Sequence, residues 1–381
     1  MSRFAVLAVC LCGIAANVWF AWNLFLPGAA GTGRNDFLEL YAGGQLAGSA
    51  DLYNQASVRA AELRAIGEYG LPFPRLPYYA LLLKPLTWMP YHRAYAVWIV
   101  MMVAALAAFG MLWPHARPAG KWMLCCWSLP AWVSVFNGQD VALLLLWVAL
   151  AVWLSRRGKE AAAGAVLALC ASKYHLVVLV PLVILAQRRW RMAAGAAGTG
   201  AALLAVSFLV AGASWPREYW AALEGPGIQQ AVSRMPNLYG LLRFLPFGLA
   251  WQALATALVA GALFLAARRT SEFEGPLALA LVGGLLVNPH TYLADCALLL
   301  PALTMTAGGA DGSRRRISGI ALATPIPWFL LELPFPLPNL TRALMVALVY
   351  EMADTLGLGW RRPAAAARKP QVAATNGKAG C

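Results

Sequence analysis

The stretch AYAVWIVMMVAALAAFGMLW, residues 94–113, decides the fold because it is apolar along its whole length and carries no charged side chain. An α-helix rises about 1.5 Å per residue, so about 20 residues of this kind cross the hydrocarbon core of a bilayer. A helix on the surface of a soluble protein keeps one polar face, and this stretch has none. It therefore predicts a transmembrane helix.

Similar apolar runs recur along all 381 residues. They cover approximately 4–27, 91–113, 122–136, 141–154, 161–172, 175–187, 192–212, 248–267, 276–288, 296–309, 317–333 and 339–357. The chain is 61% hydrophobic and 12% charged, whereas soluble domains are about 25% charged. We expect an all-α polytopic transmembrane bundle with about 12 spans, in which the ends of the shorter runs extend into the adjoining loops.

The breaks between the runs alternate in character. One set is short and basic, at 115–121, 156–159, 188–191, 268–269, 314–316 and 361–362. The other set is longer or more aromatic, at 28–90, 137–140, 172–175, 213–247, 288–295 and 334–338. Placing every basic break in the cytoplasm satisfies the positive-inside rule and puts both termini there. We expect a multi-pass protein of the plasma (inner) membrane whose second set of breaks faces the periplasm or the cell exterior.

The net charge of +14 does not indicate nucleic-acid binding, because the basic residues fall in short clusters between apolar runs, as a topology signal does. The seven cysteines show no framework spacing and are interpreted as small packed side chains or tail residues. The run 4–27 is long for a signal peptide and lacks a clear cleavage site, so we interpret it as an uncleaved first span.

The first outer loop, 28–90, is the largest part predicted outside the membrane. Residues 36–47 and 55–69 are expected to form short helices there. The apolar segment 80–89 is too short to span, which favours a re-entrant or interfacial position.

Two other segments complete the predicted organisation. The loop 213–247 resembles the first outer loop, with Trp215, Tyr219 and Trp220 expected at the membrane interface. Residues 1–362 are expected to form a single transmembrane domain, and 363–381 a disordered cytoplasmic tail.

Asp36 is the leading candidate for chemistry in the first outer loop, because polar groups near a membrane are costly and often functional. It follows Arg34 and Asn35 and opens the predicted helix 36–47. One interpretation makes it a helix N-cap, with Glu39 completing a capping box. The other makes it a general base at the outer membrane surface. The two interpretations are compatible.

A second group of candidates lies in 288–295, where Pro289 disfavours helix at the residue before it. The imidazole of His290 is suited to donating to a phosphate or shuttling a proton. Asp295, at the start of the next apolar run, either orients His290 or caps the helix. An ordinary polar turn is the competing interpretation.

Short outer connections supply the remaining candidates. Lys173 either pairs with a lipid phosphate or extends its amine toward the membrane surface. Gln139 and Asp140 either bind sugar hydroxyls or only form a turn. Arg75, before the segment 80–89, is expected to contact lipid headgroups or substrate. No nucleotide-binding loop, dinucleotide fingerprint, zinc spacing or nucleophile elbow is present in the sequence.

The order of these motifs resembles glycosyltransferase family 87, the polyprenol-phosphate-mannose-dependent enzymes of the GT-C class, from about residue 30 to 310. The segments that carry the resemblance are Asn35-Asp36-Phe37 with Tyr41-Ala42-Gly43 and Asp51-Leu52-Tyr53, Leu76-Pro77 to Lys84-Pro85, Asn137-Gly138-Gln139, Ser172-Lys173, and Asn288-Pro289-His290 with Asp295. The sequence departs from the family where a Pro-Pro pair is reduced to Pro77, where a Lys-Pro-Gln segment keeps only Lys173, and where Asp140 replaces Asn. These departures concern the acceptor more than the class.

The resemblance implies a GT-C-type fold and an inverting glycosyltransferase that moves a hexose, with mannose expected, from a polyprenol-phosphate donor to a lipid or glycan acceptor outside the cytoplasm. Asp36 is then the base, and His290 and Lys173 stabilise the departing phosphate. The predicted catalytic residues are Asp36 and His290, and the predicted substrate-binding residues are Lys173, Gln139, Asp295, Tyr41 and Arg75. A lipid phosphate is already a good leaving group, so no metal or other cofactor is expected.

Two other classes of function stay open. A transporter or flippase of a lipid-linked sugar predicts paired charges in mid-span and broken helices at matching positions in two halves. The candidates here gather on one side of the predicted membrane, which favours the enzyme. A non-catalytic scaffold protein predicts that Asp36 is replaceable.

Overall fold

The computed structural model describes residues 2–26, 32–68, 70–116, 118–225, 231–306 and 317–356. Every regular element in these ranges is helical, and each of the predicted apolar runs overlaps at least one helix. The breaks at 314–316 and 361–362 and the predicted tail 363–381 lie outside the described residues. The all-helical class is therefore confirmed for the described part of the chain.

The helices of the first third are α1 (Arg3–Phe20), η1 (Ala21–Phe25), α3 (Asp36–Leu46), α4 (Gln55–Ile66), α5 (Pro77–Leu83), η2 (Lys84–Trp88), α6 (Tyr91–Leu112) and α7 (Pro118–Trp127). The middle of the chain forms α8 (Leu129–Phe136), α9 (Val141–Arg156), α10 (Glu160–Ala168), η3 (Leu169–Val177), α11 (Val180–Ala186), α12 (Trp190–Ala211) and α13 (Trp215–Glu224). The last part forms η4 (Val232–Arg234), α14 (Leu238–Leu242), α15 (Gly248–Arg268), α16 (Glu274–Val287), η5 (Leu293–Leu299), α17 (Leu300–Thr306), α18 (Ile317–Leu322), α19 (Ile326–Leu330) and α20 (Pro338–Thr355).

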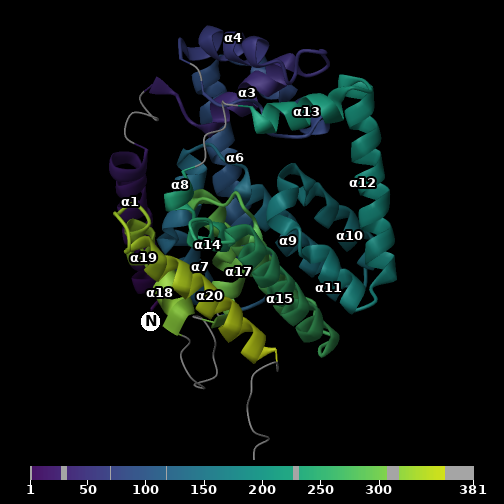
Figure 1. Cartoon of the computed structure of the whole chain (residues 1–381). Coiled ribbons are helices and arrows are strands. Elements are labelled where there is room, and N and C mark those ends of the chain that lie inside the picture. The colour runs from purple at the N-terminus through teal and green to yellow at the C-terminus, as the bar shows by residue number, and fades with distance from the viewer. Residues whose placement is uncertain are drawn as a thin grey trace, which may run out of the picture.

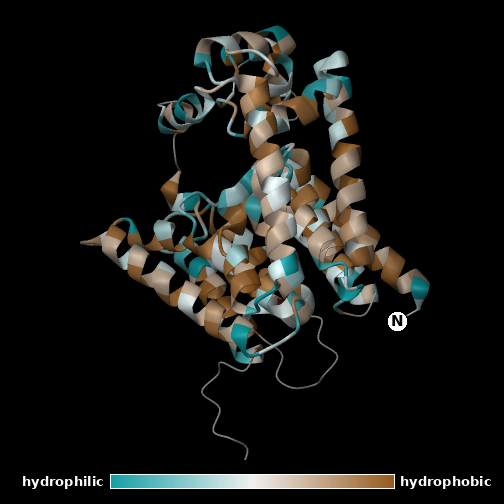
Figure 2. Cartoon of the chain, turned by 90° about the vertical axis from the view of Figure 1, so that its right-hand side faces the viewer, coloured by the Kyte–Doolittle hydropathy of each residue, from teal (hydrophilic) through white to brown (hydrophobic). Residues whose placement is uncertain are grey.

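Several helices are long and apolar enough to cross a membrane. Within the described ranges there are four, or five if a pair bent by 116° counts as one broken span. The four are Arg3–Asn23, α6, α12 and α15, and the bent pair joins Glu160–Val177 to Val180–Ala186. These helices are hydrophobic to neutral over most of their length (Figure 2). The chain is a multi-pass membrane protein.

Three of the basic breaks meet at one end of the bundle. Arg156, at the end of α9, pairs with Glu274 of α16 at 3.7 Å. Arg189, before α12, bonds Glu160 of α10 at 2.7 Å and the carbonyl of Ser271 at 2.7 Å. A cavity of about 480 Å³ opens beside them, and its rim includes arginines at positions 188, 268 and 269. The three breaks that the sequence distinguished by their basic residues therefore lie together at one end of the bundle.

The first outer loop lies at the other end, where α3, α4 and α13 lie together at the top of the molecule in Figure 1. The short helices expected at 36–47 and 55–69 are present as α3 and α4. Helix α9 runs from the turn 137–140 to the basic end, a rise of about 24 Å for its length. The candidate residues near that turn are thus separated from the basic breaks by most of a membrane thickness.

Apolar side chains remain exposed on the short helices of this end. Leu82 and Trp88, on α5 and η2, are exposed, as an interfacial segment requires. In the loop 213–247, Trp220 is exposed, but Trp215 and Tyr219 are buried. Because these two pack against protein, with Tyr219 against Tyr53 at 5.4 Å between ring centroids, the prediction that they face the membrane interface is wrong.

The carboxyl of Glu62, on α4, is buried within the first outer loop. Its Oε2 accepts from the backbone N–H of Gly70 at 2.9 Å, and burial raises the pKa of Glu62 to about 7. A carboxyl whose pKa is raised in the folded chain stabilises that chain fully below its unfolded pKa, which for Glu is about 4.3, and this stabilisation is lost as the pH rises through the folded value.

We therefore expect the Tm of the detergent-solubilised chain to fall as the pH rises from about 4.3 to about 7. In Glu62→Gln, which keeps an acceptor for Gly70 but does not titrate, this fall should be smaller. Thermal melts of both proteins across this range measure the difference. Parallel curves would show that Glu62 does not titrate there.

Candidate active site

The turn 137–140 is the platform on which helix α3 begins. The backbone N–H of Asp36 donates to the carbonyl of Asn137 at 2.9 Å. The side chain of Asn35 accepts from the N–H of Phe37 at 3.0 Å, which makes Asn35 the N-cap. The prediction that Asp36 caps this helix, with Glu39 completing a capping box, is therefore wrong. The Asp36 carboxylate is left for other contacts.

Gly138 allows the turn to approach α3 closely. Its φ is +73°, and a Cβ added there would lie 2.5 Å from the Cβ of Phe37 and 2.9 Å from its backbone nitrogen. Helix α6 fixes the turn from the other side, because Trp98 donates to the Gly138 carbonyl at 2.8 Å and Tyr95 to that of Phe136. The turn thus has little room to move relative to Asp36.

We expect Gly138→Ala to destabilise the chain by about 1–3 kcal/mol through overpacking, in addition to about 1–2 kcal/mol for a Cβ at positive φ. Gly158 has a φ of +72°, and a Cβ added there would meet nothing within 4 Å, so it is the matched control. Gly158→Ala should carry only the backbone cost. Thermal melts of the two variants separate the contributions, and equal losses of Tm would refute the close packing.

Arg75 and Asp140 form a buried ion pair beside this turn. Arg75 makes two hydrogen bonds to the Asp140 carboxylate, at 3.2 and 3.0 Å, and both side chains are almost fully buried. Contact of Arg75 with lipid headgroups is therefore excluded, and that prediction is wrong. The Asp140 carboxylate is paired with Arg75, so of the two interpretations of Asp140 the structure supports the turn rather than the binding of sugar hydroxyls.

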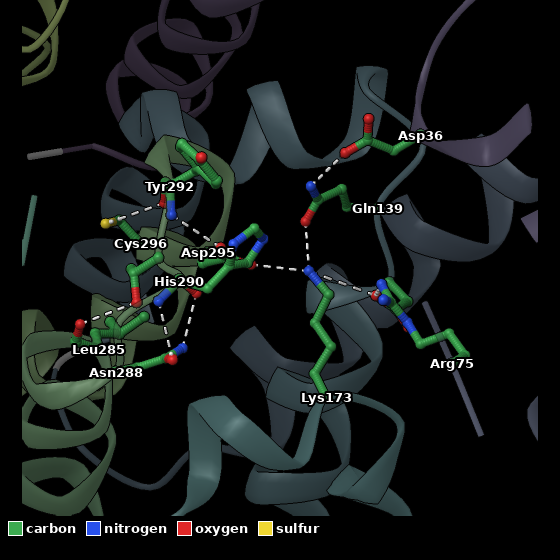
Figure 3. A network of polar contacts seen from close by, with 12 residues as sticks. Asp36, Arg75, Gln139, Lys173, Leu285, Asn288, His290, Tyr292, Asp295 and Cys296 are labelled. Carbon is green, nitrogen blue, oxygen red and sulfur yellow. Dashed lines mark hydrogen bonds and ion pairs between the residues drawn. The ribbon is translucent and has the colours of Figure 1, made fainter. Parts of the chain in front are cut away.

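Lys173 lies at the centre of the polar network drawn in Figure 3. Its amine donates to Gln139 at 2.5 Å and to Asp295 at 2.8 Å, and lies 3.8 Å from Asp140. Gln139 in turn donates to Asp36 at 2.5 Å. Because Lys173 is only 4% exposed, its amine does not extend to the membrane surface, and that interpretation is wrong. An ammonium has three donors, so one N–H remains beyond the Gln139 and Asp295 bonds.

The segment that carries Lys173 is irregular. The φ and ψ of Lys173, −130° and 58°, interrupt the 3₁₀ helix η3, within the first member of the bent pair, Glu160–Val177. Irregular backbone at this depth is tolerated where protein buries it. The interruption points the amine of Lys173 away from the helical path and toward Gln139 and Asp295.

Asp295 reaches the network from the other half of the chain. One carboxylate oxygen accepts from Lys173, and the other accepts from the N–H of Tyr292 at 3.0 Å. The capping alternative for Asp295 is therefore confirmed. The described structure gives no hydrogen bond between Asp295 and the ring of His290, although the two lie next to each other (Figure 3).

His290 is held in its turn by asparagines. Asn288 donates to the carbonyl of His290 at 2.8 Å and accepts from its N–H at 3.1 Å. Asn237 bonds the carbonyl of Asn288 at 2.7 Å. The partly exposed imidazole packs edge-on against His175, with ring centroids 6.2 Å apart. The turn thus presents His290 to the region of Lys173.

A comparison with known families decides what this arrangement belongs to. Residues 76–289, more than half of the chain, match glycosyltransferase family 87. The chain belongs to glycosyltransferase family 87. It is 25% identical over 404 residues to the polyprenol-phosphate-mannose-dependent alpha-(1-2)-phosphatidylinositol pentamannoside mannosyltransferase of Mycolicibacterium smegmatis (strain ATCC 700084 / mc(2)155), covering 94% of this chain and 92% of that relative. No solved structure matches the chain.

The predicted family is thus confirmed, and the chain is a glycosyltransferase. Of the predicted site residues, the network of this family 87 enzyme joins Asp36, Gln139, Lys173 and Asp295, with His290 beside it and Arg75 paired at its edge. Tyr41 does not join it, because its hydroxyl donates to the carbonyl of Met89 at 2.7 Å.

Burial and neighbouring charges shift the pKa of several groups at the site of the family 87 enzyme. Burial raises the pKa of Asp36, although Gln139, Lys173 and Arg75 favour its ionised form. Burial also favours neutral Asp140, but Arg75 and Lys173 outweigh it and hold the Asp140 pKa below its usual range. Burial lowers the pKa of His290; Asp295 opposes this, and Lys173 acts in the same direction as burial. A neutral imidazole and an Asp36 whose carboxylate is more basic than usual follow from these directions.

Two features of this transferase were missed in the sequence. Asn237, which bonds the His290 turn, is far from it in the chain and carries no distinguishing pattern. Glu39 was assigned to a cap, but it is buried on α3, one turn after Asp36. Its three-residue spacing from Asp36 already placed both carboxyls on one helix face.

Proposed function

We propose that this glycosyltransferase moves a mannosyl residue from a polyprenol-phosphate donor to a mannose-containing lipid or glycan acceptor, outside the cytoplasm. The observation that carries the proposal is the continuous set of contacts from Asp36 through Gln139 to Lys173 and Asp295. The donor and the acceptor class are those that the mycobacterial relative's name gives for that relative.

The reaction is an inverting single displacement. The Asp36 carboxylate takes the proton of an acceptor hydroxyl while that oxygen forms a bond to the anomeric carbon. The bond from the anomeric carbon to the phosphate oxygen breaks at the same time, and its electron pair leaves with the polyprenyl phosphate. A base with a raised pKa accepts this proton more readily than an exposed aspartate does.

Lys173 and His290 stabilise the leaving phosphate. The N–H of Lys173 that lies beyond its Gln139 and Asp295 bonds donates to a phosphate oxygen, and a neutral His290 adds a second donor. Preorganised donors of this kind act where negative charge increases in the transition state. Gln139 bonds both the base and Lys173, and so fixes the position of the Asp36 carboxylate relative to the Lys173 amine.

The membrane arrangement of the proposal follows from charge. The basic breaks at 156–159, 188–191 and 268–269 are assigned to the cytoplasm, and the site turns to the opposite side. The shorter apolar helices complete the bundle to about 12 membrane passes. The exposed apolar side chains of α5 and η2, including Leu82 and Trp88, border the path by which the polyprenyl chain enters.

A flippase of a lipid-linked sugar is the alternative. The bent pair around Lys173 resembles the broken helices of transporters, and the buried charges of Arg75, Asp140 and Lys173 are of the kind found in them. Family 87 membership favours the transferase over the flippase.

Incubation of the purified chain with synthetic polyprenol-phosphate mannose and octyl α-mannopyranoside tests the proposal. We expect a disaccharide product whose new bond has the anomeric configuration opposite to that of the donor. Retention of configuration would overturn the displacement mechanism. In proteoliposomes, movement of the intact lipid-linked sugar without cleavage would support the flippase instead.

A further inference from the structure

Glu39 is a buried carboxyl beside the proposed base that the mechanism does not use. It is 6% exposed and sits three residues after Asp36 on helix α3. Residues at this spacing are neighbours on one helix face, with Cβ atoms about 5–6 Å apart. Buried carboxyls in proteins are normally hydrogen-bonded or paired with a cation, yet within the described residues no hydrogen bond or ion pair is found for Glu39.

The charges around Glu39 place its carboxyl at the edge of the catalytic network. Burial is the largest influence on its pKa and raises it well above the usual range, with the neighbouring Asp36 acting in the same direction. Arg75 and Lys173 oppose this but are already paired with Asp140 and Asp295. These influences favour the protonated carboxyl of Glu39, which offers one O–H donor and one carbonyl acceptor.

The direction of α3 decides which substrate Glu39 can meet. The helix begins at the turn 137–140, where the N–H of Asp36 bonds Asn137, and Glu39 lies about 4.5 Å further along its axis. In-line displacement puts the acceptor and the leaving phosphate on opposite sides of the anomeric carbon. In the proposed mechanism Lys173 and His290 hold the phosphate, so a group beyond Asp36 along α3 is assigned to the acceptor side.

We propose that the Glu39 carboxyl binds a hydroxyl of the acceptor sugar next to the one that reacts, and so holds a mannoside acceptor against Asp36. This inference rests on the proposed function. It deepens that function by assigning Glu39 to recognition of a sugar diol, in which one oxygen meets Asp36 and its neighbour meets Glu39.

The test separates acceptor binding from donor binding. The full-length chain in detergent is assayed with short-chain polyprenol-phosphate mannose and octyl α-mannopyranoside, each varied in turn, and donor hydrolysis by water is followed in parallel. We expect Glu39→Met to raise the acceptor KM about tenfold, the loss of one hydrogen bond to a buried group, while the donor KM changes less than about threefold. Glu39→Gln, whose amide also has a donor and an acceptor, should stay within about threefold of wild type in both.

Glu62→Gln is the matched control, because Glu62 is also a buried carboxyl of the outer loop but bonds the backbone of Gly70. It should leave the acceptor KM unchanged. An unchanged acceptor KM in Glu39→Met, or a fall in kcat alone, would overturn the assignment. If Glu39→Met does not fold, monodeoxy octyl mannosides assayed with the wild type replace it. We then expect that removal of one hydroxyl besides the reacting one raises the acceptor KM. If no such removal raises it, the assignment is overturned.

Failure of the proposed function gives a different result. Wild-type protein that hydrolyses the donor but does not glycosylate octyl mannoside would overturn the mannoside acceptor alone. Wild-type protein that neither hydrolyses the donor nor transfers from it would overturn the proposed function, and the assignment of Glu39 with it.

Discussion

Asp36→Asn should reduce sugar transfer by about 10² to 10⁴, the range for loss of a general base, without lowering the Tm. Asparagine has the size of aspartate and keeps a side-chain oxygen for the Gln139 amide, which donates to Asp36 at 2.5 Å. Asparagine cannot act as the base that removes the proton from the hydroxyl of the acceptor sugar. Initial rates with polyprenol-phosphate mannose, together with thermal melts, measure the two effects.

The unchanged Tm follows from the sign of the pKa shift at Asp36. Burial raises its pKa, so its contribution to stability is present at low pH and is lost as the pH rises through the folded value. A neutral asparagine therefore removes no stabilisation at neutral pH. Asn35→Ala is the matched control, because Asn35 is the N-cap. It should cost about 1 kcal/mol of stability and retain more activity than Asp36→Asn. Full activity in Asp36→Asn would remove the base assignment.

Lys173→Met should cost about 3–5 kcal/mol of stability, because it leaves the buried carboxylate of Asp295 without its cation. Asp295 loses a contact at 2.8 Å and Asp140 loses one at 3.8 Å. Gln139 also loses its partner, so the contact between the two ends of the site is broken. A large fall in Tm and a loss of transfer are expected together, and the double variant that follows separates them.

Lys173→Met combined with Asp295→Asn removes both members of the buried pair. Because replacing a whole buried pair is often close to neutral, most of the Tm should return while transfer remains lost. Lys84→Met, at an exposed lysine of the first outer loop that bonds the carbonyl of Ala47, should change the Tm little. Recovery of transfer in the double variant would show that Lys173 has no role at the phosphate.

The helices were predictable because a long apolar run in a membrane protein is stable in the lipid bilayer only as a helix. The runs 91–113, 192–212 and 248–267 correspond to α6, α12 and α15 within a few residues. The run 122–136 is instead divided into α7 and α8, and Ser128 between them caps α8. A hydroxyl and a following Leu-Pro pair were weak signals inside an apolar stretch.

The sequence predicted which residues belong to the site better than it predicted their hydrogen-bond and ion-pair partners. Polar residues in outer turns are costly, which singled out Asp36, Gln139, Lys173 and Asp295. Their partners depend on which turns meet in space, and that follows from packing of distant helices. For this reason Arg75 was expected at headgroups but is buried with Asp140, and Glu39 was assigned to a cap that Asn35 provides.

A cryo-EM map of the chain with a non-cleavable mannosyl phosphonate of a short polyprenol tests the central claim most directly. We predict that the phosphonate lies within hydrogen-bond distance of Lys173 and His290, with the anomeric carbon facing Asp36. A phosphonate bound instead at the opposite end, in the basic cavity lined by Arg188 and Arg268, would contradict it.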